Sequence, residues 1–528
     1  MTETRVFEHR TLLRHPRRTV FDWLAAPGAL QRMNPPFASE LAAGPSDGLR
    51  EGSQTRLRIG APGSLGLFAG AVDGALRAAL PAAVSRRIPA ALSPRLPWRA
   101  RHTAYEEGRM FRDEMASGPL SAWRHTHSVE DAAPGEADTA EGEPGAVVVD
   151  RVEYALPGVG TAGRLPVVGR PAADAAHRVF EAELRRQFEF RGRVMAEDLD
   201  FHAGHPGPLV GGPARTVLVT GAGGLVGTQL CALLTGGGHR VIRLVRSPAQ
   251  AEAEDAVLWD PAGGTVDTAA LRAADVVVNL AGEPLAGRFT EKHRRAVHDS
   301  RVDGTRTLVD AIARLPEAER PTVLVNGSAV GWYGADAGAG PDGRGLTEDL
   351  PAGDDFLAGV VADWEAQARR AEELGLRVVR VRTGIVLSPT GGMLAQLLPL
   401  FLAGAGGPVA TRGGRSHDGS PWISWIGVDD IAGVFAHAAL AEGVVGAVNG
   451  TAPEPVTAKE FARVLGTVLH RPAAVPVPEF GPRLLLGEQG AAELVRADQK
   501  ASAELVLDSG YAFRDAALEG ALRRLLGR

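Results

Sequence analysis

The sequence has a single cysteine, Cys231, among 528 residues. An intrachain disulfide and any zinc site built from several cysteines are therefore excluded. Cys231 falls within an expected helix, where we predict that it packs rather than acts as a nucleophile. Basic residues are also in slight deficit, because 57 lysines and arginines face 63 acidic residues and leave a formal net charge of −6. This balance gives no support for nucleic-acid binding.

Long hydrophobic runs are missing as well. The most apolar stretch, from Leu65 to Leu96, is interrupted by Asp73, Arg77, Arg86 and several prolines, so it does not read as a membrane span. We interpret it as an amphipathic insertion. The opening MTETRVFEHR lacks the apolar core of a secretory signal. We therefore expect a cytoplasmic protein without an integral membrane segment.

The length suggests two to four domains. Residues 203–214, AGHPGPLVGGPA, are small and proline-bearing and are typical of a linker. Residues 134–146, PGEADTAEGEPGA, read as an exposed acidic loop. We predict a first domain over 1–205, a linker over 206–214 and a second domain over 215–528.

Residues 216–227, TVLVTGAGGLVG, begin as a β-branched strand, continue into a glycine turn and lead into a helix. This is the context that a dinucleotide-binding loop requires, although an ordinary βα turn is the alternative. The first glycine would make the turn, the second would let backbone N–H groups approach a pyrophosphate, and the third would let helix and strand pack closely. The residues expected at the phosphates are Gly221, Gly224, Leu225, Val226 and Gly227.

The second strand, HRVIRLVRSP, carries no acidic residue where NAD-binding proteins hold the ribose 2′-hydroxyl. It has Arg243, Arg246 and Ser247 instead. A guanidinium suits a 2′-phosphate because it is charged and can bond in a bidentate manner, so we predict NADP rather than NAD. The alternative is that one or both arginines are solvated. Asp260, at the end of the next strand, could meet the adenine edge or cap a turn.

Further apolar runs over 275–285, 322–334 and 377–389 read as buried parallel strands. They alternate with helical stretches over 301–314 and 355–374. This alternation predicts an α/β fold with a doubly wound parallel sheet of the Rossmann type.

Small and polar residues follow two of these strands. Asn279, Ala281 and Gly282 are expected to leave room for the backbone of the cofactor. Ser328 and Tyr333 follow the next strand, at the sheet edge where such folds bind ligands. We predict Tyr333 as a proton donor and Ser328 as its partner at a substrate oxygen. The alternative is a packed aromatic ring and a turn hydroxyl.

Several runs together resemble an epimerase-like family of the extended, atypical short-chain dehydrogenase/reductase superfamily. They include TGAGGLVG, NLAGEPLAGRFTEKHRRAVHDSRVDGTRTLVDAI, GSAVGWYG, SWIGVDDIA and NGTAPEPVTAKEFARVLGTVLHRP. The resemblance covers about 215–525, with a family-specific terminal segment near 475–525. It implies a nucleotide-binding domain with a small substrate lobe, whereas the substrate is not defined.

The chain departs from this family's pattern at the catalytic helix. Superfamily enzymes carry a Tyr-x-x-x-Lys pair there, whose lysine lowers the pKa of the tyrosine. Here the region reads DDFLAGVVADWE, with Phe356 or Leu357 and then Val360 or Val361, and no lysine lies within 328–369. The usual proton relay is therefore missing.

A second departure follows Trp425. Relatives commonly read Trp-Ile-His-x-Asp-Asp, whereas this chain has Gly427 in place of the histidine. We expect helix capping for Asp429 or Asp430 at least as much as catalysis. The nearby loop offers three candidate replacements for the lost imidazole, although solvated loop residues are the preferred interpretation. These are Arg412, Arg415 and His417.

The first domain has its own signature. Strands are expected at 5–13, 110–115, 122–129 and 146–156, short helices from 19 to 33, and a long helix over 172–198. This order describes an α+β helix-grip fold. The runs FEHRTLLRHPRRTVFDWLAAPGALQRMNPPF and FRDEMASGPLSAWRHTHSVE resemble the SRPBCC (START-like) superfamily. The resemblance implies a curved sheet around the long helix and a cavity for an apolar ligand.

His125 and His127 alternate on one strand of this domain, so both side chains point to the same face. They could line the cavity, pair on a metal or be ordinary surface histidines, and we favour the last interpretation. No third ligand is evident in the sequence, so we predict no metal.

The sequence leaves three functions open. The leading one is an NADP(H)-dependent oxidoreductase or epimerase-like enzyme with an unknown small carbonyl or alcohol substrate and a fused ligand-binding module. The second is a non-catalytic NADP(H)-responsive binding protein. The third is a carrier of an apolar ligand in the first domain.

Overall fold

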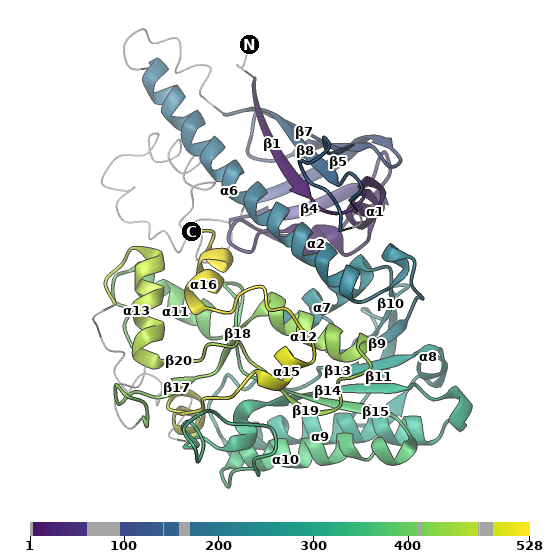
Figure 1. Ribbon diagram of the computed structural model, residues 1–528, viewed down its shortest axis with the longest axis vertical. Coiled ribbons are helices and arrows are strands. Elements are labelled where there is room, and N and C mark those ends of the chain that lie inside the picture. The colour runs from purple at the N-terminus through teal and green to yellow at the C-terminus, as the bar shows by residue number, and fades with distance from the viewer. Residues whose placement is uncertain are drawn as a thin grey trace. The chain divides into compact units, whose positions relative to one another are not determined.

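Figure 1 shows the computed structural model, which describes residues 4–60, 96–140, 142–157, 169–408, 414–473, 475 and 489–528. The chain forms two compact units. The first comprises Met1–Gly212 with Thr235–Gly238 and Arg524–Gly527, and the second holds the rest. Residues 65–95 of the predicted amphipathic insertion lie outside the described residues.

The first unit is built on a seven-stranded antiparallel sheet of order β1-β8-β7-β6-β5-β4-β2. The four strands predicted from sequence are confirmed: β1 (Arg5–Leu13), β6 (Met110–Ser117), β7 (Ala122–Asp131) and β8 (Ala146–Ala155). The sequence analysis missed β2 (Ser39–Ala43), β3 (Ser46–Leu49), β4 (Gln54–Ile59) and β5 (Leu96–Glu106). Strand β5, LPWRARHTAYE, alternates Trp98, Ala100 and His102 inward with arginines outward. Trp98 is the one large apolar side chain among these three, so the hydrophobic pattern is weak.

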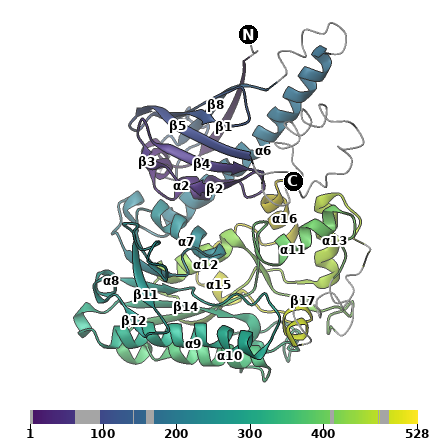
Figure 2. The same cartoon turned by 180° about the vertical axis from the view of Figure 1, so that it is seen from behind.

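Helices α1 (Arg17–Ala25), α2 (Ala29–Met33) and α6 (Gly169–Gly204) accompany this sheet. Helix α6 is the predicted long helix, extended at both ends, and Figures 1 and 2 show it running along the sheet. Phe180, Leu184 and Phe188 of α6 pack with Phe7 and Tyr154 of the sheet into one hydrophobic cluster. The helix therefore buries an apolar face against the strands, as its helical spacing predicts.

The second unit contains an eight-stranded sheet of order β12-β11-β10-β9-β13-β14-β15-β19. Every pairing in it is parallel except that of β11 with β12. The strands are β9 (Thr216–Thr220), β10 (Arg240–Val245), β11 (Ala256–Asp260), β12 (Thr265–Val266), β13 (Val276–Asn279), β14 (Val323–Ala329), β15 (Arg377–Thr383) and β19 (Gly446–Gly450). Because the order runs outward in both directions from β9 and β13, the predicted doubly wound α/β fold is confirmed.

Helices cover both faces of this sheet. Leu308 and Ile312 of α9 (Glu291–Ala313) pack against Leu218, Val277 and Leu324 of the central strands. Figure 1 shows α9 and α10 (Phe356–Arg369) on one face and α7 (Leu225–Gly236) and α12 (Val428–Leu440) on the other. The central strands are apolar on both sides, which explains their continuous valine-rich runs.

Shorter elements complete the two units. The helices are α8 (Thr268–Ala273), α11 (Gly392–Leu402), α13 (Ala458–Leu469), α15 (Glu504–Asp508) and α16 (Leu518–Leu526). Two small sheets pair β16 (Ile385–Leu387) with β18 (Trp425–Gly427) and β17 (Trp422–Ile423) with β20 (Val456–Thr457). Short helical turns are η2 (Pro208–Val210), η3 (Glu317–Glu319), η4 (Val330–Tyr333), η5 (Glu372–Leu374) and the π-helical η6 (Ala491–Val495). Among the described helices, none is both long enough and apolar enough to cross a bilayer.

A buried ion pair joins α2 to α6 in the first unit. The Arg32 guanidinium donates to both carboxylate oxygens of Asp198, at 2.8 Å and 2.9 Å, and both side chains are fully buried. Such a pair adds little to the stability of the fold compared with apolar side chains in the same place. Removal of only one partner is strongly destabilising, because the remaining buried charge loses its counter-ion.

We therefore expect Arg32→Met to lower the free energy of unfolding of the first unit by about 3–5 kcal/mol. Arg50→Met is the matched control, because Arg50 pairs with Asp47 in an exposed position and should change stability by less than about 1 kcal/mol. Urea unfolding followed by tryptophan fluorescence measures both. Equal effects of the two substitutions would contradict this account.

Candidate functional site

The turn between β9 and α7 depends on two glycines. A side chain at either position would displace the neighbouring backbone. Gly221 has a φ of 66°, and a Cβ there would lie 2.8 Å from the carbonyl carbon and oxygen of Leu280. A Cβ on Gly227 would lie 2.2 Å from the Gly221 oxygen. The positive φ of Gly221 fits the turn expected of it, and the absence of a side chain at Gly227 lets the helix begin close to that turn.

The helix start that follows presents unpaired donors. Within the part of the chain that the structure describes, the backbone N–H groups of Leu225, Val226 and Gly227 have no hydrogen-bond partner. The first turn of α7 carries no acidic side chain, and Gly224 beside it is exposed. Free N–H groups at the positive end of a twelve-residue helix form an anion-binding site, which fits a pyrophosphate.

A buried polar ladder crosses the ends of the central strands. Thr220 donates to Asn279 at 2.7 Å, and the Asn279 amide donates to Thr305 and Asn326, both at 2.8 Å. The indole of Trp364 also donates to Thr305, at 2.9 Å. The Asn279 side chain is buried and binds its neighbours on three elements, so it has a structural role at these strand ends.

Ala281 and Gly282 lie just beyond this ladder. The Ala281 N–H donates to the Thr220 hydroxyl at 3.1 Å, and Gly282 is exposed. A Cβ on Gly282 would lie 3.1 Å from the guanidinium carbon of Arg301. Arg301 donates to the carbonyls of Glu283 and Val297, both at 3.0 Å, and no carboxylate among the described residues pairs with it. Burial lowers the pKa of Arg301 to about 10.

Arg301 is thus a partly buried cation beside the strand ends, and the sequence analysis missed it. In the sequence it is one arginine among several on a long helix, and nothing in the spacing marks it. Only the fold shows that its guanidinium turns back toward the 281–283 backbone.

The two arginines of the β10 region that are candidates for a 2′-phosphate differ in their surroundings. Arg243 forks onto Asp255, with Nε and Nη2 at 2.7 Å and 2.5 Å from the two carboxylate oxygens. Arg246 is exposed just beyond the strand and forms no ion pair with any described residue, and Ser247 follows in a turn. Of the two arginines, Arg246 is therefore the one whose guanidinium forms no ion pair among the described residues.

Asp260 ends β11 in an exposed position. Its carboxylate accepts a hydrogen bond from the backbone N–H of Ala262 at 3.1 Å. The sequence leaves open whether Asp260 contacts the adenine or caps a turn, and this hydrogen bond is a turn cap.

Ser328 and Tyr333 lie in one buried network with three residues from other elements. The Ser328 hydroxyl donates to Glu365 at 2.7 Å, and the Tyr333 hydroxyl donates to Asn449 at 2.8 Å. Arg382 links the two, because it donates to Glu365 at 2.9 Å and to the Tyr333 oxygen at 3.2 Å. The two hydroxyls are thereby joined through a buried ion pair.

The electrostatics of this network keep the phenol protonated. Tyr333 is only 6% exposed, and burial raises its pKa to about 12, although the Arg382 charge opposes the shift. Tyr333 is therefore a neutral hydrogen-bond donor over the ordinary pH range. Sequence reasoning placed Ser328 and Tyr333 in one turn, but it missed Glu365, Arg382 and Asn449.

Helix α10 follows the Ser328 strand, where superfamily enzymes carry the Tyr-x-x-x-Lys pair, but it contains neither of these two residues. Leu357, Val360 and Val361 are buried in it, and Asp355 caps its start by accepting from the Ala358 N–H at 2.8 Å. The side chains at the positions of the usual pair therefore pack into the core.

Of the two acidic residues after Trp425, Asp429 and Asp430, the second has a structural role. The N-cap of α12 is Gly427, so the expected capping by Asp429 or Asp430 is wrong. Asp430 instead accepts from the backbone N–H of Arg514 at 2.8 Å and from the Tyr511 hydroxyl at 3.1 Å, which fastens the C-terminal segment.

The loop with the three candidate replacements for the missing imidazole exposes the two candidates that the structure describes. Arg415 and His417 are exposed, and Arg412 lies outside the described residues. Cys231, on α7, is half-buried, and burial raises the pKa of its thiol to about 12, which favours packing over nucleophilic chemistry.

The model of the NAD dependent epimerase/dehydratase family matches residues 217–449, and a domain of unknown function, DUF1731, matches residues 477–525. The chain is 36% identical to the chloroplastic epimerase family protein SDR39U1 homolog of Arabidopsis thaliana over 59% of this chain and 86% of that protein. It is 35% identical to the epimerase family protein YfhF of Bacillus subtilis over 59% of this chain and 97% of that protein.

The chain belongs to the NAD dependent epimerase/dehydratase family. Its second unit is the part that these family relatives share, and its Rossmann-type sheet is the family's nucleotide-binding fold.

Two solved structures of this family are also similar to the chain. The human epimerase family protein SDR39U1, solved with NADPH, is 32% identical with a TM-score of 0.51 and covers 59% of this chain and 99% of its own. A nucleoside-diphosphate sugar epimerase from Corynebacterium glutamicum is 28% identical with a TM-score of 0.69 and covers 99% of this chain and 90% of its own. The second likeness extends over the first unit, so this epimerase-family chain shares its two-part organisation with a solved protein.

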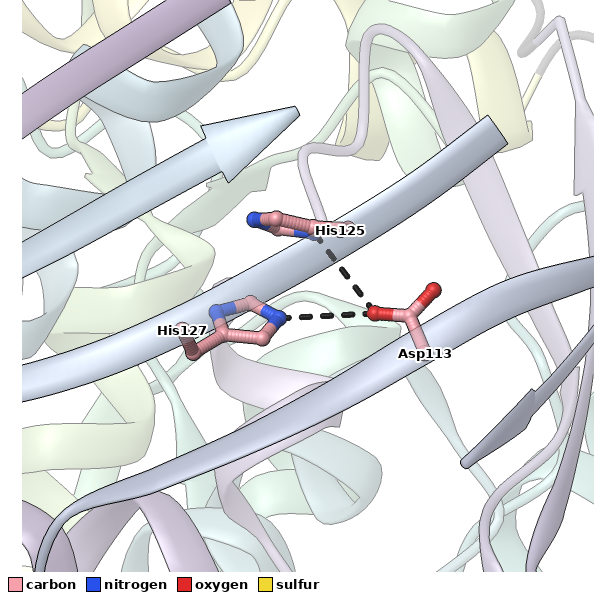
Figure 3. A group of neighbouring side chains, drawn as sticks. All are labelled: Asp113, His125 and His127. Carbon is pink, nitrogen blue, oxygen red and sulfur yellow. Dashed lines mark ion pairs between the residues drawn. The ribbon is translucent and has the colours of Figure 1, made fainter. Parts of the chain in front are cut away.

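One sequence expectation about the first unit is wrong. His125 and His127 are not surface residues, because they are 3% and 4% exposed. A third potential ligand also exists: Asp113 of β6 lies beside both rings, as Figure 3 shows. Sequence spacing could not bring Asp113 to them, because the contact depends on the pairing of β6 with β7.

The glycine turn yields a direct test of nucleotide binding. We expect Gly224→Val to abolish NADPH binding and leave the fold intact, since a Cβ at Gly224 meets only the Gly221 oxygen, at 3.2 Å, while its side chain would stand over the free N–H groups. Gly443→Ala is the control, because a Cβ there has no neighbour within 4 Å. Quenching of tryptophan fluorescence by NADPH measures the affinity. Unchanged affinity of Gly224→Val would remove this turn from the binding site.

Proposed function

We propose that the chain is an NADP(H)-dependent oxidoreductase or epimerase-like enzyme that acts on a small carbonyl or alcohol substrate. The observation that carries the proposal is the start of α7, where three free N–H groups stand at the positive end of the helix without an acidic neighbour. When bound, the nicotinamide cofactor supplies the hydride chemistry. The residues of this chain bind it, orient it and supply the proton.

The loop over 221–227 would hold the pyrophosphate, and the small residues Ala281 and Gly282 would border the cofactor. Arg246 and Ser247 would hold the 2′-phosphate, because Arg243 is already engaged by Asp255. Preference for NADP over NAD is supported by the absence of an acid at this strand end and by the human relative that was solved with NADPH.

We assign the proton to Tyr333, with Ser328 at the substrate oxygen. Ser328 lies in the last residues of β14 and Tyr333 in the turn η4 that follows it, at the carboxyl edge of the sheet, where doubly wound folds bind substrates. A phenol with a pKa of about 12 gives up a proton only to a strongly basic atom, such as the oxygen of a carbonyl that is being reduced. The site should therefore favour carbonyl reduction over alcohol oxidation.

The first unit is proposed as an SRPBCC-like module that binds an apolar ligand. Its sheet and long helix follow the helix-grip order, and they border a cavity of about 440 Å³. Apolar side chains such as Leu30, Met33 and Trp98 line much of the cavity. In this proposal 1–205 binds the ligand, 206–214 links the two parts, and 215–528 binds the nucleotide.

A second candidate function is a non-catalytic NADP(H)-responsive binding protein. One observation favours it: both candidate hydroxyls already donate to buried partners, Ser328 to Glu365 and Tyr333 to Asn449. Catalysis would require at least one of them to turn toward a substrate. The two functions share the nucleotide site and differ only in turnover.

Selectivity for the 2′-phosphate is testable at Arg246. We expect Arg246→Ala to weaken NADPH binding by about 1.5–3 kcal/mol, or roughly 10- to 150-fold, and to leave NADH binding unchanged, since a charge-assisted hydrogen bond is lost. Arg240→Ala at the opposite end of β10 is the matched control. Fluorescence titrations with both nucleotides measure the effect. A wild-type chain that binds NADH as tightly as NADPH would contradict the assignment.

Turnover is testable at Tyr333. We expect Tyr333→Phe to reduce the rate of NADPH-dependent carbonyl reduction by about 10²–10⁴-fold with unchanged NADPH affinity. Tyr511→Phe removes another buried phenol, which lies against Asp430, and should leave the rate per folded molecule unchanged.

Oxidation of NADPH with a panel of carbonyl compounds measures these rates. Full activity of Tyr333→Phe would show that Tyr333 only packs. A wild-type chain that binds NADPH but oxidises none with any carbonyl would favour the binding-protein function.

A further inference from the structure

Four neighbouring strands of the first unit bring histidines and aspartates to one place. His102 on β5 is the register partner of Asp113 on β6, and Asp113 is the partner of His125 on β7. His127, two residues further along β7, is the partner of Asp150 on β8. Residues in these positions point to the same face of a sheet, and here that face borders the cavity.

Asp113, His125 and His127 converge on one point, as Figure 3 shows. Oδ2 of Asp113 lies 3.6 Å from Nδ1 of His125 and 3.5 Å from Nε2 of His127. One ligand atom from each of the three residues lies within 4.8 Å of the others. These separations are too long for good hydrogen bonds, which require about 2.7–3.2 Å.

The same separations suit a metal ion. Zinc binds imidazole nitrogen and carboxylate oxygen at about 2.0–2.2 Å in a tetrahedral arrangement. Two ligand atoms of a tetrahedron with such bonds stand about 3.3–3.6 Å apart. Oδ2 of Asp113 keeps this distance from both imidazole nitrogens.

Asp150 orients both imidazoles from behind. Its Oδ1 lies 2.9 Å from Nε2 of His125 and 2.7 Å from Nδ1 of His127. Because an ionised carboxylate only accepts, each ring directs an N–H to Asp150 and turns its other nitrogen toward Asp113. An outer carboxylate that fixes the tautomer of a ligating histidine is the usual second layer of a protein metal site.

The surroundings hold the two rings in place. Phe111 stacks on His127 with ring centroids 4.1 Å apart, and Phe188 meets His125 edge-on at 5.2 Å. His102 lines the same cavity, and its buried Nδ1 has no hydrogen-bond partner among the described residues.

We propose that Asp113, His125 and His127 bind a divalent transition-metal ion of the zinc type, with Asp150 as the orienting carboxylate. Three protein ligands leave a fourth position, which faces the cavity and is open to water or to an oxygen-bearing ligand. The unpartnered His102 nitrogen is placed to bind that water or ligand. The inference is independent of nucleotide binding in the second unit.

The test uses the full chain after treatment with a chelator and dialysis. Calorimetric titration with Zn²⁺ should show one tight site per chain. Asp113→Asn and His127→Gln should abolish that site, because each replaces a ligand by a weak amide donor. Asp150→Asn should keep the stoichiometry and weaken the affinity about 10- to 100-fold.

His298→Gln is the matched control. His298 also lies between two carboxylates, Asp299 and Asp363, but in an exposed position outside the first unit, so its loss should leave the tight site unchanged. Circular dichroism and thermal unfolding confirm that each variant is folded.

A measurement on the unaltered chain removes any dependence on the folding of variants. In crystals soaked with Zn²⁺, an anomalous difference peak should lie between Asp113, His125 and His127. The absence of saturable Zn²⁺ binding, a peak only at other residues, or unchanged affinity in folded Asp113→Asn would each overturn the proposal. In those cases the cluster holds a proton rather than a metal.

Discussion

The close contact between the two ends of the 221–227 turn is the constraint on which the nucleotide-binding unit depends. The oxygen of Gly221 occupies the space that a side chain at Gly227 would need, so α7 starts directly on the end of β9. The first N–H groups of α7 have no acceptor within the helix, as at any helix start, and this short connection places them at the switch point between β9 and β13. A longer turn would separate the helix dipole from the strand ends.

Much of this unit could be predicted from the sequence because its central strands are apolar on both faces. The runs around β9, β13 and β14 are continuous in valine and leucine, and each is bounded by a turn or a helix start. The glycine turn has a fixed spacing along the chain, so it is equally visible. These features are local, and local patterns survive without knowledge of the fold.

The features that sequence reasoning missed depend on contacts between distant segments. Glu365, Arg382 and Asn449 meet Ser328 and Tyr333 only after α10, β15 and β19 are placed, and Asn449 and Arg382 are cross-strand partners. In the first unit, β4 and β5 were not predicted, although Leu57 and Ile59 of β4 and Trp98 of β5 face the core while arginines face outward. The buried position of the β7 histidines was not predicted either, because alternation identifies a face but does not say which face is buried.

The polar clusters discussed above are of two kinds: in one, the polar groups have hydrogen-bond partners within the protein, and in the other, some of them do not. In the Ser328–Tyr333 network every hydroxyl and the Arg382 guanidinium have partners, so the network is held by its own bonds and needs no ligand to be stable. The start of α7 and the Asp113–His125–His127 cluster are different. The first leaves N–H donors without acceptors among the described residues, and the second leaves a carboxylate oxygen 3.5–3.6 Å from two imidazole nitrogens. A bound ion would pair these groups in both places, an anion at α7 and a cation in the cavity. The opposite signs follow from the chemistry of the groups that are left unpaired.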